Sequence, residues 1–483
     1  MQNNQKKKIT KGILLWALVI AGYFIFIFNW MVMDSMAGST AGETGWIFTF
    51  FPDQQPDPLL TQSINYTITF MRGLGAFLAG WFLVKVGHKH AIYVAMGLLT
   101  FGIIAPFLQY YAIFIIARML MAIGGTTLIV YTQPIIANYF TKPETKSKLN
   151  VFNSVGFNFG SICAITPFIF WTTGLQLHWM VFSSGFAAIS LIILVLYVIF
   201  GEDIDLDTSN IAGDSAITFK SVLKEKTTWK FSLSYVFWLV AVVLYMTMVT
   251  KYFIIPFNPW FGLEGNYWAI PTLKVLFLLG IVPGVFAFRF VATGTYSRKP
   301  LIVVVLIVGI LAMLISTMLA AFTGTGYSTA PVYEGTNYVG NEVVEATTSI
   351  VGLFFAMLFI LISGTCLWGI QGILLGMTYS YSGATPKKQG ILLGFIWGIG
   401  YMGLTIVNII MALFVGIGTG DELKYIVGTG DSNIGEILGI IFFFAVCLLS
   451  PLIFLLAKET HKGNNFFNIK YVNLKHKLKI KNH

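Results

Sequence analysis

Twelve stretches of about twenty apolar residues run through the chain between Gly12 and Leu456. An α-helix rises ~1.5 Å per residue, so about 20 apolar residues are needed to cross a hydrocarbon core of ~30 Å. In lipid, backbone amides must be paired internally, so continuous apolar runs of this length predict helices. An even number of spans places both ends of the chain on one side. The stretches are 13–33, 63–86, 91–109, 112–137, 151–173, 179–200, 230–253, 272–293, 301–322, 349–381, 390–415 and 436–457.

The composition indicates the same class of protein. Apolar residues make up 56 % of the chain and charged residues 10 %, with a mean hydropathy of +0.78. A soluble domain would carry about 25 % charged residues. Membrane-spanning strands need alternating runs of about 10 residues, which these continuous runs do not show. We therefore expect an all-α membrane protein with twelve transmembrane helices.

Positive charges fall on alternate connections between the stretches. Lysine and arginine gather at the N-terminus, in the connections 2–3, 4–5, 8–9 and 10–11, and in the C-terminal tail, whereas the opposite connections are mainly acidic. Basic loops stay in the cytoplasm, so we expect a multi-pass protein of the cell membrane with both termini cytoplasmic. The net charge of +10 then follows from this topology, and no nucleic-acid partner is expected.

One long polar stretch divides the twelve spans into two sets of six. Glycines four residues apart recur in the fifth and eleventh stretches, which supports two related halves. Two related bundles around a central path are typical of alternating access by rocking of one half against the other. The expected parts are an N-terminal six-helix bundle at 1–200, a central cytoplasmic loop at 201–229, a C-terminal six-helix bundle at 230–457 and a basic cytoplasmic tail at 458–483.

Short motifs in the first half resemble those of the major facilitator superfamily. The connection from Gly80 through Gly87 to Lys89 is similar to the family's loop motif Gly-x-Leu-x-Asp-Arg-x-Gly-Arg-Arg, with Val84 where the aspartate belongs. The fourth stretch contains Arg118, Ala122 and Gly124 at the positions of the family's Arg-x3-Gly-x-Gly. A third segment, Leu177-His178-Trp179-Met180, lies where the family often has a Trp-Arg-Trp entry to the sixth helix.

The resemblance implies two pseudo-symmetric six-helix bundles that act as a monomer to move a small-molecule solute across a lipid bilayer. In the family, the aspartate of the loop motif pairs with cationic groups at the cytoplasmic end and helps to hold the outward-facing state. Val84 cannot form such pairs, so this contact is expected to be weakened or supplied otherwise.

Three arginines lie inside the apolar stretches, where a charge costs several kcal/mol unless it is paired or faces a cavity. Arg72 is near the middle of the second stretch, and Arg289 lies in the eighth, its counterpart in the other half. A guanidinium offers a planar set of donors that matches carboxylate, nitrate or phosphate. Two such groups facing one cavity would form an anion site. Arg118 is interpreted as structural.

Neutral polar residues inside the stretches supply further candidates for the solute path. Asn158 and Gln133 are the preferred hydrogen-bonding groups beside the arginines. Each of the others is as compatible with bridging two helices as with contacting solute. They are Asn29, Tyr66, Asn153, Tyr245, Gln371 and Tyr401. Trp238, Trp368 and Trp397 are candidates for packing in the core or for walls on which a sugar ring stacks.

The fifth stretch allows a comparison with one subfamily. Asn153, Asn158 and Gly160 match the Asn-Gly-Gly-x-Gly-Asn-x-Gly segment of the nitrate/nitrite porters, whereas Ser154, Val155 and Phe157 replace its other glycines. These porters also carry one arginine in the second helix and one in the eighth. This resemblance favours a small or phosphorylated anion.

We therefore expect a secondary active or facilitative transporter of a small polar solute, preferably an anion. Asp34 and Glu436 lie at the ends of their stretches, so no deep carboxylate suggests proton coupling, and uniport or anion exchange is favoured. The alternatives are a facilitator of a neutral solute such as a sugar, and a non-transporting membrane scaffold. No enzyme is expected, since the histidines lie in loops or the tail, and no metal site, cofactor or ATP-binding loop is predicted.

Overall fold

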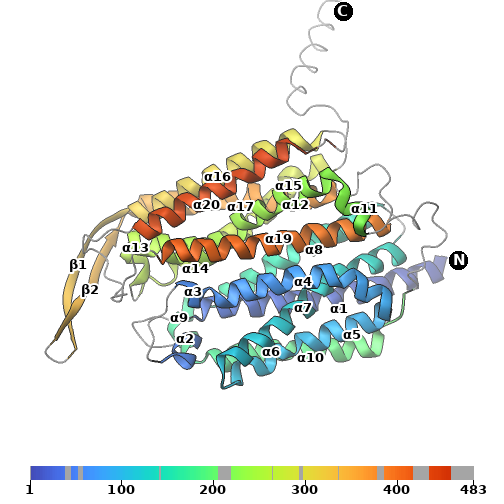
Figure 1. Cartoon of the computed structure of the whole chain (residues 1–483), viewed down its shortest axis with the longest axis horizontal. Helices are drawn as coiled ribbons and strands as arrows, with labels where there is room; N and C mark the ends of the chain where they lie inside the picture. Colours follow the sequence, from blue (N-terminus) through green and yellow to red (C-terminus); the bar gives the residue numbers. More distant parts are fainter. Residues whose placement is uncertain are drawn as a thin grey trace, which may run out of the picture.

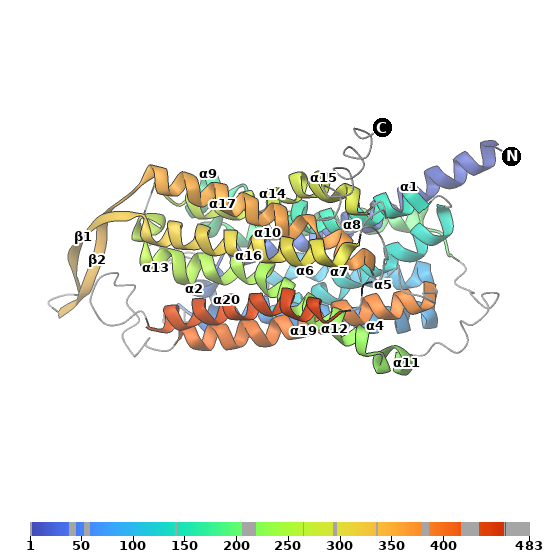
Figure 2. The ribbon, with the colours of Figure 1, turned by 90° about the horizontal axis from the view of Figure 1, so that it is seen from above.

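The computed structural model describes residues 2–37, 45–52, 58–140, 143–204, 219–263, 265–292, 297–334, 337–377, 386–416, 434–457 and 459. Long helices run side by side, with the N-terminus at one end and a β-hairpin projecting from the other (Figure 1 and Figure 2). Much of the expected central loop, 205–218, and almost all of the expected basic tail lie outside the described residues.

Each of the first six expected spans corresponds to a helical segment. Between the first two lie the short helices α2 (Trp46–Phe50) and α3 (Pro58–Thr61). The fifth span is bent by 69° at Pro167, since proline interrupts the hydrogen bonds of a helix. The segments are α1 (Gln2–Ser35), α4 (Ser63–Val86), the run of α5 (His88–Leu99), α6 (Phe101–Ile104) and η1 (Ala105–Phe107), then α7 (Tyr111–Tyr139), the bent pair α8 (Pro143–Ile165) and α9 (Phe168–Leu177), and α10 (Trp179–Phe200).

The other six expected spans are also helical, and three of them change course or winding along their length. The seventh turns from an α-helix into a π-helix, and the eighth and tenth break near Gly280 and Ile370. The segments are α12 (Lys226–Leu239), η2 (Val240–Ile254) and α13 (Ile255–Phe257), then α14 (Ala269–Leu279) with α15 (Ile281–Ala292), α16 (Arg298–Phe322), α17 (Ile350–Gly369) with α18 (Gln371–Gly376), α19 (Pro386–Val415) and α20 (Ile434–Leu455). Two short helices, α11 (Phe219–Lys224) and η3 (Pro259–Gly262), flank the seventh span.

The described part of the chain holds ten helices that are long and apolar enough to cross a membrane, and an eleventh span if the bent pair counts as one. The remaining expected span is α4, a helix of 24 residues that carries Arg72 and Lys85. The prediction of an all-α membrane fold is thus confirmed for the membrane-spanning part.

The two halves meet along two main pairs of helices. Helix α4 packs against α19, and α8 packs against α14. The hydroxyls of Thr69 and Thr405 lie 2.7 Å apart across the first contact. Across the second, the amide of Asn158 donates to the Leu278 carbonyl at 3.2 Å. Direct side-chain hydrogen bonds therefore connect the halves at both pairs.

Close helix packing within the second half depends on glycine. A methyl group added at Gly280 would come within 2.3 Å of the backbone of Gly364 and Thr365. One added at Gly364 would lie 2.0 Å from the Phe277 carbonyl oxygen. The backbones of α14 and α17 thus approach as closely as small residues permit.

The acidic connection after the ninth span forms a β-hairpin, which was not predicted from the sequence. Strands β1 (Gly324–Glu334) and β2 (Asn337–Thr348) pair antiparallel, from Gly324 opposite Thr348 to Glu334 opposite Asn337, with three shifts of register. The hairpin extends well beyond the helices (Figure 2). It links the ends of α16 and α17, which pack against each other.

Candidate functional site

A small cavity lies between the two halves, beside the transition from α12 to η2 and the break between α17 and α18. Its volume is about 10 Å³, which is close to the room that one water molecule needs. Helices α1 and α8 contribute residues from the first half, and α12, η2, α17, α18 and α19 contribute from the second. The lining residues are Tyr23, Asn153, Phe157, Trp238, Leu239, Val243, Trp368, Gln371, Trp397 and Tyr401.

Aromatic rings form most of this wall and contact one another. Phe157 stacks on Trp368 with ring centroids 5.2 Å apart, which joins the two halves across the cavity. Tyr235 stacks on Trp238 at 5.1 Å, and the ring of Trp238 meets that of Trp368 edge-on at 5.5 Å. Such faces pack well against flat or ring-shaped solutes.

Two polar atoms of the cavity wall are buried without a hydrogen-bond partner among the described residues. They are the Trp368 Nε1, a donor, and the Gln371 Oε1, an acceptor. Their residues are 2 % and 4 % exposed. By contrast, the amide of Asn153 accepts from the Trp16 indole and donates to Thr132, both at 2.8 Å. Buried polar atoms are normally paired, so Trp368 and Gln371 are the groups available for a solute.

Arg72 lies behind this wall rather than in it. Its side chain is fully buried, with the guanidinium carbon 4.0 Å from the centre of the Tyr401 ring and 4.9 Å from that of Trp30. Nη2 donates to the Tyr23 hydroxyl at 3.2 Å, whereas Nε and Nη1 have no partner among the described residues. The charge is thus held by aromatic faces, and two of the residues that it contacts, Tyr23 and Tyr401, line the cavity.

The structure therefore brings some of the predicted site residues together and separates others. Asn153, Gln371 and Tyr401 line the cavity. Asn158 joins α8 to α14, and its Oδ1 has no partner among the described residues. Tyr245 is buried against Phe277, with ring centroids 5.0 Å apart.

The remaining predicted contacts are not among the described residues that line the cavity. Asn29 donates to the Ile25 carbonyl of its own helix at 3.0 Å. Gln133 donates to Asn150 at 3.0 Å, which bridges α7 and α8. Tyr66 is half-buried on α4. Arg289 lies in α15, but its side chain is outside the part that the structure describes.

Two aromatic lining residues, Tyr23 and Phe157, have no counterpart among the sequence candidates. Both lie in apolar stretches where aromatic residues are common, so composition does not distinguish them. Phe157 occupies a position where the nitrate/nitrite porter segment has glycine. This difference is the one feature of the sequence that could have indicated Phe157 as a lining residue. Its ring fills the space between the halves.

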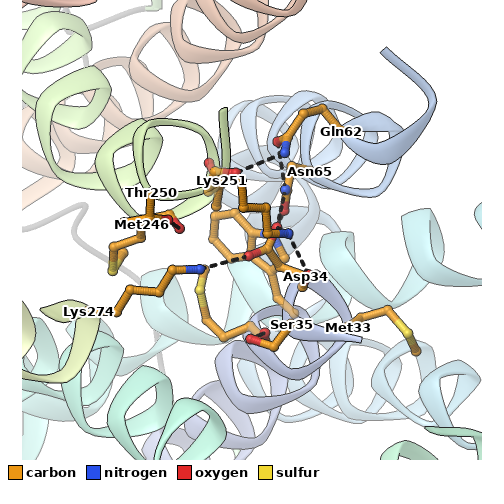
Figure 3. A network of polar contacts seen from close by, with 12 residues as sticks. Met33, Asp34, Ser35, Gln62, Asn65, Met246, Thr250, Lys251 and Lys274 are labelled. Carbon is orange, nitrogen blue, oxygen red and sulfur yellow. Dashed lines mark hydrogen bonds and ion pairs between the residues drawn. The ribbon is translucent and has the colours of Figure 1, made fainter. Parts of the chain in front are cut away.

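A second polar cluster, unlike any prediction, is centred on Asp34 near the C-terminal end of α1 (Figure 3). Helix α1 runs from the N-terminus toward the end of the molecule that carries the hairpin (Figure 1). Asp34 was expected at the outer mouth of the first span, yet it is only 3 % exposed. Its Oδ1 accepts from Lys251 at 3.1 Å and from Asn65 at 2.8 Å, and its Oδ2 lies 3.7 Å from the Lys274 Nζ. The cluster connects α1 and α4 of one half with η2 and α14 of the other.

The motif residues occupy the N-terminal half. Gly87 has φ +82, a conformation that favours glycine, and a Cβ there would face the carboxylate of Asp203. That carboxylate accepts from the backbone N–H of Lys89 at 3.2 Å, at the start of α5. A methyl group at Gly124 would lie 2.3 Å from the Ala95 carbonyl, whereas Gly80 has open space around it.

Further charged groups make contacts at the end of the first half where α5 begins. Lys11 of α1 forms an ion pair with Glu202, which also accepts from the Tyr139 hydroxyl at 3.2 Å. The hydrogen bond from Lys11 holds the pKa of the Glu202 carboxyl below its usual value. The carboxylates Glu202 and Asp203 thus contact this end although Val84 replaces the motif's aspartate.

The fold, the cavity between the halves and the motif together define a major facilitator superfamily transporter. Its architecture resembles that of a D-xylose–proton symporter with a TM-score of 0.63, covering 93 % of this chain and 99 % of that one at 13 % identity. It also resembles the nucleoside transporter NupG, with a TM-score of 0.62, 12 % identity and coverage of 93 % and 100 %. At these identities the similarity shows the fold alone.

The sequence places the chain within this superfamily more narrowly. A profile described as the Mycoplasma MFS transporter matches residues 114–416. An uncharacterised protein of Mesomycoplasma hyopneumoniae is 31 % identical over 436 residues, 88 % of this chain and 86 % of that protein. A major facilitator superfamily transporter of Mycoplasma genitalium is 26 % identical, with coverage of 94 % and 92 %. The chain belongs to the Mycoplasma MFS transporter family and is a multi-pass membrane transporter of a small-molecule solute.

Proposed function

We propose that this transporter carries a small, neutral, hydroxyl-bearing ring solute by alternating access. The observation that carries the proposal is the cavity wall. It combines aromatic faces with the unpaired Trp368 donor and Gln371 acceptor. No charged side chain is among the described residues that line it. The alternative of a neutral solute, left open by the sequence, is therefore favoured over the anion.

The chemistry of such a solute matches both features of the wall. A hydroxyl group both donates and accepts, so it can pair with Trp368 and Gln371 in one orientation. A buried group left unpaired costs about 1–3 kcal/mol, so satisfying both atoms favours binding. The ring faces of Trp238 and Phe157 supply apolar contact on the sides. Solved structures with this fold include transporters of D-xylose and of nucleosides, which are both solutes of this kind.

The closed cavity fits an occluded stage of the transport cycle. Its volume of about 10 Å³ is far below the ~300–1,000 Å³ of typical small-molecule pockets. Binding therefore requires the two halves to separate. Rocking of one half against the other would open the space between helices α1 and α8 of the first half and the α12–η2 and α17–α18 segments of the second.

An anion remains the second candidate because of Arg72. Its Nε and Nη1 have no partner among the described residues, and its guanidinium contacts the rings of the lining residues Tyr23 and Tyr401. A rotation of either ring during opening would place two guanidinium donors at the cavity. Inhibition of uptake by nitrate, phosphate or carboxylates would favour this candidate.

The test is uptake into vesicles that contain the purified protein. We expect flux of pentoses, hexoses or nucleosides, and competition among them but not by inorganic anions. Trp368→Phe and Gln371→Leu should each lower uptake roughly tenfold or more, the effect of ~1.4 kcal/mol per lost hydrogen bond. Trp171→Phe is the matched control, because Trp171 is 69 % exposed. Wild-type rates in both cavity variants would refute the site.

The location is part of the proposal. The lysines of the first turns of α1 and the basic connections favour a cytoplasmic N-terminus and C-terminus in the cell membrane. The hairpin end then faces outward. We also propose that residues 1–200 and 230–457 form two bundles that are joined by the loop at 201–229. We propose further that the transporter acts as a monomer.

A further inference from the structure

We propose that Asp34 forms an ionic latch with Lys251 and Lys274 that holds the two halves together at the hairpin end of the molecule (Figure 3). Asp34 comes from the first half, and both lysines come from the second. The Lys251 Nζ also donates to the backbone carbonyl of Asp34 at 2.7 Å. Each of these contacts has to break before the hairpin end can open.

The latch lies between the cavity and the hairpin end of the molecule. Asp34 follows the lining residue Tyr23 by eleven positions on the continuous helix α1, a distance of ~16 Å along the axis. Lys251 follows the lining residue Val243 on η2, in the same direction. A solute entering from the hairpin end therefore meets the latch first.

A neutral network holds the carboxylate in place. Asn65 donates to Asp34 and to the Gln62 Oε1 at 2.9 Å, and it accepts from the Trp30 indole at 2.9 Å. Gln62 in turn donates to the Thr247 carbonyl of η2 at 2.9 Å. Asn65 and Gln62 are 1 % and 0 % exposed. This arrangement fixes the direction in which Asp34 points, so that it faces the lysines.

The balance of charge makes the latch asymmetric. Two ammonium groups share one carboxylate, so losing Asp34 leaves two like charges facing each other inside the protein. Losing one lysine leaves a neutral pair. The loss of hydration on burying an ion pair offsets much of the attraction between its charges. When this end opens, the charges become hydrated again, so the free-energy cost of separating them is small. The latch is thus specific in geometry yet reversible in each cycle.

The experiment measures how fast a buried thiol near the latch reacts. In a chain whose cysteines 163, 366 and 447 are replaced by alanine, Thr250→Cys places a thiol one residue from Lys251. Thr250 is fully buried, so a hydrophilic maleimide reaches it only when this end opens. Purified protein in detergent suffices, which makes the test independent of the orientation in the membrane.

We expect Asp34→Asn to raise the labelling rate roughly tenfold or more, because the closed state then holds two facing cations. Lys251→Met should raise it several-fold, and it retains the neutral Asp34–Lys274 pair that allows folding. Asp203→Asn is the matched control, since this carboxylate accepts from the Lys89 N–H of the first half and has no contact with the second half among the described residues. Wild-type labelling in folded Lys251→Met or Asp34→Asn protein would overturn the latch.

Discussion

Arg72 shows how aromatic rings can stabilise a single charge inside a membrane protein, since no acidic partner is paired with it among the described residues. Its guanidinium lies 5.2 Å from the ring centre of Phe26 and 4.0 Å from that of Tyr401, and it donates to Tyr23. Because the Tyr23 hydroxyl accepts this bond, its own proton is free to point toward the cavity. Arg72 is thus a positioning residue for the cavity wall.

We therefore expect Arg72→Lys to fold but to transport poorly. Lysine keeps the charge but loses the planar face that stacks on Tyr401, a contact of ~1–2 kcal/mol. This corresponds to a roughly tenfold higher KM for a neutral solute.

Uptake kinetics of Arg72→Lys and Tyr23→Phe check this role. Tyr23→Phe removes the bonded hydroxyl but keeps the ring, so it should reproduce part of the loss. Full activity of Arg72→Ala would exclude any part for the arginine in transport.

Part of the polar lining of the cavity could be predicted from the sequence. Gln371, Asn153 and Tyr401 were predicted from their place inside apolar stretches, and they line the cavity. Arg72 was predicted to contact solute, but rotation about a helix decides whether a side chain faces a hollow or a neighbouring ring. That rotation depends on the packing partners, which hydropathy does not report.

Asp34 illustrates the same limit. Its place near the end of the first stretch suggested exposure at the mouth, whereas the approach of Lys251 and Lys274 from distant segments buries it. Neither lysine is near Asp34 in sequence, so nothing in the local pattern indicates the pairing.

At the level of elements, the close approach of α14 and α17 leaves no space for a side chain. Gly280→Ala should therefore destabilise the protein by ~1–3 kcal/mol through overpacking. The measurement is thermal unfolding in detergent, with Gly185→Ala on α10 as control because nothing lies within 4 Å of its added methyl group. Equal melting temperatures for the two variants would contradict the packing described.

The start of α5 depends on a carboxylate from outside the helix. Asp203→Ala removes the acceptor for the Lys89 N–H, and it should cost ~0.5–2 kcal/mol, as for the loss of a helix cap. Asp203→Asn keeps an acceptor and should cost less. Thermal unfolding of the two variants checks the order, and a reversed order would argue against capping.

Helix positions were predictable because apolar length alone defines a span. Residues 112–137 were expected and α7 runs from Tyr111 to Tyr139. The breaks near Gly280 and Ile370 were not predictable. The backbones of neighbouring helices approach closely at Gly280 and Gly369, and glycine is too common in these stretches to mark such positions. The β-hairpin escaped prediction because its polar residues also suit an irregular loop.

For the whole molecule, the hairpin is separable from transport. We expect that replacing residues 329–344 by Asn-Gly, a pair suited to a two-residue turn, leaves uptake within twofold. The base of the hairpin must be retained, since Asn258 donates to the Ala320 carbonyl at 2.8 Å and to Thr348 at 3.3 Å. A loss of uptake with normal folding would instead assign the hairpin a role in solute capture.

The π-helix η2 carries Val243 of the cavity wall near one end and Lys251 of the latch near the other. In this winding each amide bonds five residues back instead of four. If these hydrogen bonds changed to the four-residue spacing of an α-helix, one end of the segment would rotate about the helix axis relative to the other. Because Val243 and Lys251 lie on the same π-helix, such a rotation would change the orientation of the cavity wall and of the latch together.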